Sequence, residues 1–189
     1  MTKLDTSLAA IDAANSRDPD LVDDQPASLL YGQRMTAEQE RLFPDARDAL
    51  RIAARGQHIE RWVLRRAQYP EGREGYLTWR RDLARHHADR VAEIMADAGY
   101  DAADIDAARR MLMKQGIKRE ADVQALEDII CFVFLKWYFE PFSTTQDPDK
   151  LLRIVEKTAR KMSPEARARV LEEFDLPDAF AAAFKEPAA

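Results

Sequence analysis

The chain has 189 residues, of which 46% are apolar and 33% charged, and its formal net charge is −5. This composition is typical of one globular domain rather than of a disordered chain. The acidic balance argues against general nucleic-acid binding, which needs a basic surface, but it leaves room for one basic pocket. The single cysteine excludes an internal disulfide, and no apolar run has signal-peptide or membrane-span length, so we expect a cytoplasmic protein.

Helical periodicity predicts an all-α, single-domain bundle over residues 1–189, because no segment alternates long enough to indicate a strand. The segment DPDLVDDQPAS is expected to be a polar loop, and residues 63–73 break the helical pattern around the turn signal YPEG. The helices expected in this half lie over residues 5–15, from an N-cap at Ser28 to about Phe43, and from Asp45 to Gln57.

The second half should also be helical. The segment 120–139 is apolar nearly all round after Asp128, which predicts a central buried helix with Phe134 in the core and an end at Pro141. The expected helices lie over about 75–98, from Asp101 or Asp104 to Gly116, over roughly 120–139, from Asp147 onward, from Ser163 to about Phe174, and after Pro177.

All three histidines lie in the stretch QHIERWVLRRAQYPEGREGYLTWRRDLARHH. His58 ends one apolar stripe and His87 lies within another, so both should face the core, whereas His86 is expected nearer the surface. A buried histidine is most often hydrogen-bonded to a carboxylate or a carbonyl. Two inward imidazoles with carboxylates available would also suit a metal ion.

Glu127 and Asp128 are the candidate carboxylates, at the start of the apolar segment. A buried carboxylate must be paired or bound to a metal, because its desolvation is costly. An ion pair with an arginine, or a favourable position at a helix N-terminus, explains them equally well.

Arginines interleaved with aromatic residues surround the histidines. Such a run is usually a solvated face, but guanidinium groups also bind phosphate bidentately, and aromatic rings can order them. We therefore expect a small anionic or phosphorylated ligand. The residues expected to bind it are Arg34, Gln57, Arg61, Arg66, Tyr69, Arg73, Trp79, Arg80 and Lys118.

Over residues 28–140 the chain resembles the HD-domain superfamily of metal-dependent phosphohydrolases, most closely a small, functionally uncharacterised bacterial branch. Gln57-His58-Ile59 falls at the family's His-Asp-Ile position, His86-His87 at a later histidine pair, and Leu126-Glu127-Asp128 at the last aspartate. Tyr31 stands where the first family histidine would be. Additional C-terminal helices would occupy about residues 147–184.

The resemblance implies a divalent metal held by His58, His87 and Asp128, with Glu127 as the catalytic base, and hydrolysis of a phosphorylated small molecule or nucleotide. One alternative is a non-catalytic anion- or nucleotide-binding module with the histidines hydrogen-bonded. Another is an iron-dependent oxygenase or lyase. We expect no membrane partner and no nucleic acid, and the sequence leaves a homo-oligomer open.

Overall fold

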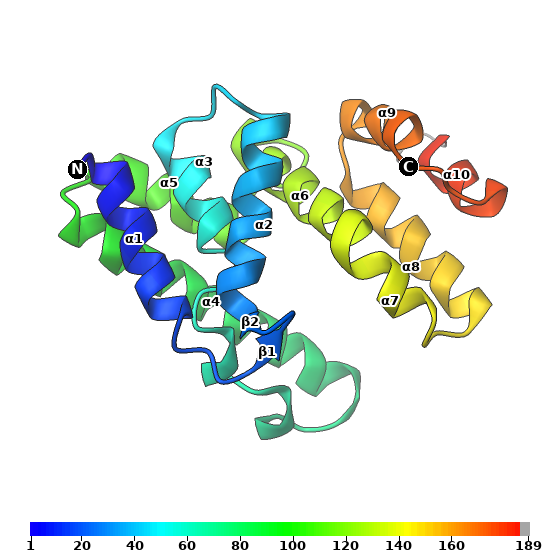
Figure 1. The fold of residues 1–189 in the computed structure, drawn as a ribbon, viewed down its shortest axis with the longest axis horizontal. Helices are drawn as coiled ribbons and strands as arrows, with labels where there is room; N and C mark the ends of the chain where they lie inside the picture. The colour runs from blue at the N-terminus through cyan, green and yellow to red at the C-terminus, as the bar shows by residue number, and fades with distance from the viewer. Residues whose placement is uncertain (186–189) are drawn as a thin grey trace. The chain divides into compact units, whose positions relative to one another are not determined.

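The computed structural model describes residues 1–185 and is mostly helical, as expected, apart from one small hairpin in that region (Figure 1). The chain forms two compact units, Met1–Gly116 and a second one from Ile117 onward. This boundary lies inside residues 28–140, the region for which an HD-like domain was predicted.

The first unit runs from blue to green in Figure 1. Its long helix α4 packs against α1 and α5, and α3 packs against α2 and α5. The inner side of α4 buries Leu83, Val91 and Met95, which are eight and four residues apart and so share one face of the helix. The elements are α1 (Lys3–Asn15), β1 (Leu21–Val22), β2 (Gln25–Pro26), α2 (Ala27–Leu42), α3 (Asp48–Arg55), η1 (Arg61–Val63), η2 (Arg66–Gln68), α4 (Gly72–Asp97) and α5 (Ala102–Leu112).

The segment before α2 differs from the predicted polar loop. It contains a two-residue antiparallel hairpin, β1–β2, and Ser28 lies inside the first turn of α2 rather than capping it. Buried Asp18 explains the difference, because its Oδ2 accepts hydrogen bonds from the Ser28 backbone N–H at 2.9 Å and from the Ser28 hydroxyl at 2.5 Å. The serine hydroxyl is therefore engaged by a distant carboxylate, which sequence periodicity does not show.

Two predicted boundaries move. Helix α3 begins at Asp48 and not at Asp45, and α5 ends at Leu112, before Gly116. The N-cap of α5 is Asp101, whose carboxylate accepts hydrogen bonds from backbone N–H groups of the first turn. Of the two predicted starting residues, Asp101 and Asp104, the first is therefore correct.

The break at 63–73 is confirmed. The chain makes two 3₁₀ turns, η1 and η2, before α4 starts at Gly72, which has a φ of +83°. Gly75 permits the close return of this segment, because a Cβ there would lie 1.9 Å from the carbonyl oxygen of Pro70. The return brings residues 61–69 back beside the N-terminal half of α4.

In the second unit, α6 packs against α8, and α10 packs against α8 and α9. Asp147 and Ser163 are the N-caps of α8 and α9, as predicted. The elements are α6 (Ala121–Val133), the π-helical segment η3 (Phe134–Tyr138), α7 (Phe139–Ser143), α8 (Pro148–Lys161), α9 (Pro164–Glu173) and α10 (Asp178–Lys185).

The predicted central helix is confirmed in part. Residues 125–129 and 131–133 of α6 are buried, so the helix lacks a polar face. Pro141 does not end the helical run, which passes through η3 and α7 to Ser143. Phe134 is only half-buried, whereas Phe132 is 0% exposed. The widened π-helical turn begins at Phe134, and it changes which side chains face inward.

Over residues 1–185, every helix is too short or too polar to cross a membrane.

Candidate anion-binding site

Two imidazoles and one phenol ring form the centre of the candidate site in the first unit. His58 follows α3, His87 lies on α4, and their ring centroids are 5.9 Å apart. Tyr31 of α2 stacks on His58 with ring centroids 3.8 Å apart and an interplanar angle of 17°. Three separate elements therefore bring these rings together. His87 is buried, as its apolar stripe predicted, whereas His58 is half-buried.

Both imidazoles are uncharged at neutral pH. Burial lowers the pKa of His87 to about 3, and the neighbouring charges of His86, Arg61 and Arg80 act in the same direction. Burial also holds the pKa of His58 well below its usual value, with Arg61, His87 and Arg80 adding to the effect. The strongest charged neighbours of this histidine pair are therefore cations.

Three buried polar atoms on residues 57–87 have no hydrogen-bond partner within residues 1–185. They are Nε2 of His87, a residue that is 4% exposed, Nε2 of His86 and Oε1 of Gln57. The expected pairing of His87 with a carboxylate or a carbonyl through this atom is absent from the described part of the chain. A buried polar atom without a partner is uncommon, and a ligand would satisfy it.

The positive charge of Arg80 is close enough to Arg61 to affect its pKa. Burial lowers the pKa of Arg61 first, and the positive charge of Arg80 lowers it further. The guanidinium carbon Cζ of Arg61 lies 5.1 Å from the centroid of the Trp79 ring. Trp79 is itself held in place, because its Nε1 donates to the Leu64 carbonyl oxygen at 2.9 Å. The aromatic ring thus orients Arg61.

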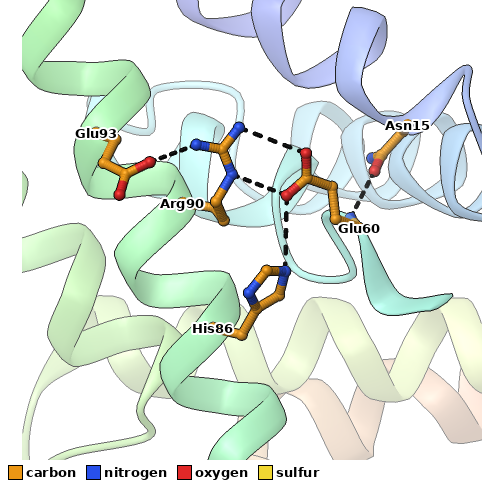
Figure 2. Close-up of polar contacts among 5 residues, drawn as sticks. All are labelled: Asn15, Glu60, His86, Arg90 and Glu93. Carbon is orange, nitrogen blue, oxygen red and sulfur yellow. Dashed lines mark hydrogen bonds and ion pairs between the residues drawn. The ribbon is translucent and has the colours of Figure 1, made fainter. Parts of the chain in front are cut away.

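The turn that carries His58 and Arg61 is tied to α4 by Glu60 (Figure 2). The Glu60 carboxylate accepts from Arg90 Nε at 2.8 Å and Nη2 at 3.4 Å, and lies 3.6 Å from His86 Nε2. The Arg90 guanidinium also pairs with Glu93. His86 is half-buried, and burial lowers its pKa, while Glu60 raises it.

Several other residues that were expected to bind an anion either contact protein groups instead or are exposed to solvent. Arg34 pairs with Asp23 of the hairpin turn at 2.8 Å. Arg66 donates to the Tyr69 carbonyl oxygen at 3.0 Å, and the Tyr69 hydroxyl lies 3.4 Å from Asp82 Oδ2. Arg73 is exposed at the start of α4. Arg66 and Tyr69 therefore stabilise their own turn.

Asp128 belongs to the second unit. Its Oδ1 accepts from Gln124 Nε2 and from the Ser163 backbone N–H, both at 2.9 Å. Burial raises the pKa of Asp128, although these hydrogen bonds oppose the shift. The carboxylate thus links α6 to the start of α9.

Glu127 and Lys118 also belong to the second unit. Glu127 is 2% exposed, and its Oε1 lies 3.6 Å from Lys161 Nζ. An ion pair with an arginine was expected for the buried carboxylates, and Glu127 instead lies near a lysine. Lys118 is exposed. The convergence of Glu127, Asp128 and Lys118 with the histidine pair stays a prediction.

Across the described residues 1–185, no three or more His, Cys, Asp or Glu side chains are grouped to hold a metal ion. The first unit supplies two imidazoles, His58 and His87, and the third predicted ligand lies in the second unit. The histidine pair alone does not complete a metal site.

Sequence reasoning missed Glu60, Asn15 and the stacking role of Tyr31. Glu60 lies two residues after His58 and directly before Arg61. Its left-handed backbone cannot be predicted from the hydrophobic periodicity of the sequence. Asn15, at the end of α1, contacts the same turn from 45 residues away in the sequence. Only the adjacency of Glu60 to His58 and Arg61 was available as a signal.

The molecule is thus a mostly helical protein whose first unit carries a cationic site with two uncharged histidines. A family model described as domain of unknown function (DUF4202) matches residues 5–183, and the chain belongs to this family. The match spans both compact units. Comparisons with curated proteins and with solved structures find no match.

Proposed function

We propose that the first unit binds a small anionic ligand, with a phosphate group as the best-suited anion, between Arg61, Arg80 and the His58–His87 pair. One observation carries the proposal. Within residues 1–185, Arg61 and Arg80 form no ion pair, yet the charge of Arg80 acts on Arg61, and both charges act on His87, a buried imidazole with an unpartnered nitrogen.

The charges favour an anion. Burial is the main cause of the lowered pKa of Arg61, and repulsion by the Arg80 charge lowers it further. A bound anion would relieve that repulsion. Guanidinium groups bind phosphate through two parallel hydrogen bonds. Because Arg61 is already oriented by Trp79, little side-chain entropy would be lost on binding.

The imidazoles add specificity to this site. A neutral imidazole has one N–H donor and one acceptor nitrogen, so His87 Nε2 can either donate to a phosphate oxygen or accept from a phosphate hydroxyl. Tyr31 holds the His58 ring by stacking. The ligand would thus meet two charged and two neutral groups.

Replacing Arg61 or Arg80 with glutamine should weaken the binding of inorganic phosphate about 10- to 100-fold, because each change removes a hydrogen bond to a charged group. Isothermal titration calorimetry of the full chain measures the effect. Arg85→Gln is the matched control: like Arg80→Gln, it removes a positive charge from an exposed position on α4, but only Arg80 contributes to the lowered pKa of His58 and His87. Equal affinities in the wild type and all three variants would contradict the proposal.

A second candidate function is metal-dependent hydrolysis of a phosphorylated compound or nucleotide, as in the HD domains that the sequence resembles. Its support is that His58 and His87 are adjacent and uncharged, the protonation state that metal ligands require. Asp128 would be the third ligand and Glu127 the base. A bound divalent metal would supply an ionised water near neutral pH.

Metal content distinguishes this second candidate. Wild-type protein purified without chelator or affinity tag should contain a divalent metal in near-stoichiometric amount if the candidate is right, and His58→Ala and His87→Ala should lose it. Elemental analysis gives both the amount and the identity, and bound iron would favour the oxygenase or lyase alternative. Equal metal content in all three proteins would rule out these histidines as ligands.

A further inference from the structure

Glu60 adopts a backbone conformation that residues with a side chain rarely use. Its φ and ψ are 50° and 36°, in the left-handed region. A glutamate gains nothing intrinsically from this conformation, which persists only where surrounding contacts impose it. The contacts around Glu60 come from two helices.

The first contact involves the backbone. The Glu60 N–H donates to Oδ1 of Asn15, at the end of α1, at 3.0 Å. Asn15 is 1% exposed, and its Nδ2 lies 3.4 Å from the Ser28 carbonyl oxygen of α2. The amide of a buried side chain thus holds the turn from one side (Figure 2).

The second contact involves the carboxylate. It accepts two hydrogen bonds from Arg90 and faces His86, both on α4 (Figure 2). Arg90 and His86 flank His87 in the sequence, three residues and one residue away. Glu60 therefore anchors the turn against α4 at the level of the histidine that lines the candidate site.

We propose that Glu60 is a positioning residue for the anion site: it holds the turn so that His58 lies beside His87 and Arg61 lies over Trp79. This inference rests on the proposed anion-binding function. Glu60 directly precedes Arg61 and is two residues from His58, so a change in its backbone redirects both side chains. Glu60 itself does not contact the anion.

Charge alone predicts the opposite effect. Removing a carboxylate near an anion site strengthens anion binding by a direct Coulomb effect. Removing an anchor weakens binding, because the arginine and the imidazole lose their fixed positions. The sign of the change in phosphate affinity thus separates a positioning role from a purely electrostatic one.

The test uses Glu60→Gly and Glu60→Gln in the full chain. Glycine tolerates the left-handed backbone and deletes the carboxylate, whereas glutamine keeps an oxygen that can accept from Arg90. We expect Glu60→Gly to bind inorganic phosphate at least about fivefold more weakly, and Glu60→Gln to recover part of that loss. Glu93→Gln is the matched control, since Glu93 pairs with Arg90 from an exposed position.

A ligand-free readout separates this inference from the proposed function. In phosphate-free buffer, nuclear Overhauser contacts between the Tyr31 and His58 rings should weaken in Glu60→Gly and persist in Glu93→Gln. A general loss of stability would leave these contacts intact in the folded molecules. If wild type binds no phosphate, the anion-site proposal fails, and the ring contacts alone decide the positioning role. Unchanged ring contacts, or unchanged or tighter phosphate binding in Glu60→Gly, would overturn it.

Discussion

Replacing Phe132 with alanine should lower the free energy of unfolding by about 3–5 kcal/mol. The Phe132 side chain is 0% exposed, and its ring lies 5.9 Å from that of Phe174, which follows α9. Deleting the ring removes its burial and leaves a cavity that the surrounding buried side chains cannot easily close. Urea denaturation followed by circular dichroism measures the loss.

Phe134→Ala is the matched control for this effect. Phe134 lies two residues further along, is only half-buried, and contacts Phe139 and Phe142 edge-on. Its replacement should cost clearly less than that of Phe132. Equal losses for the two variants would show that the π-helical turn does not divide buried from half-buried positions.

The second large effect is a loss of stability in acid through His87. Its pKa is about 3 in the folded protein, below the usual value of 6.5. Between these values the unfolded chain binds a proton that the folded protein excludes, so stability is present above pH 6.5 and is lost as the pH falls. From pH 7 to pH 5, this one group should remove about 2 kcal/mol from the free energy of unfolding.

Urea titrations of wild type and His87→Gln at pH 7, 6 and 5 measure this term. Phosphate must be left out, because a bound anion would itself stabilise the charged imidazole. The stability difference between the two proteins should shrink by about 2 kcal/mol at pH 5. The stability difference between wild type and His86→Gln should change less with pH, since His86 is half-buried and faces Glu60. A difference that is constant with pH would mean that His87 titrates normally.

The uncharged histidines also bear on the proposed anion site. Keeping His58 and His87 neutral beside Arg61 and Arg80 avoids adding two further positive charges to a crowded cationic site. An anion would then be bound by the arginines and oriented by the imidazoles. The cost is acid sensitivity, so the same burial that shapes the site limits the pH range of the fold.

Much of the secondary structure was determined locally. Asp147 and Ser163 cap their helices because a short oxygen-bearing side chain satisfies free backbone N–H groups of the next turn. The inward direction of His87 followed from the apolar stripe of α4, since residues three or four apart share one face. These features depend on neighbours within a few residues, which the sequence displays directly.

The tertiary structure decided what depends on distant partners. Ser28 lost its predicted capping role to Asp18, and Glu60 took a left-handed backbone imposed by Asn15 and Arg90. The separation of the His58 and His87 rings and the place of Arg61 over Trp79 depend on that turn. Such geometry arises from hydrogen bonds and packing between segments ten or more residues apart, which local periodicity does not encode.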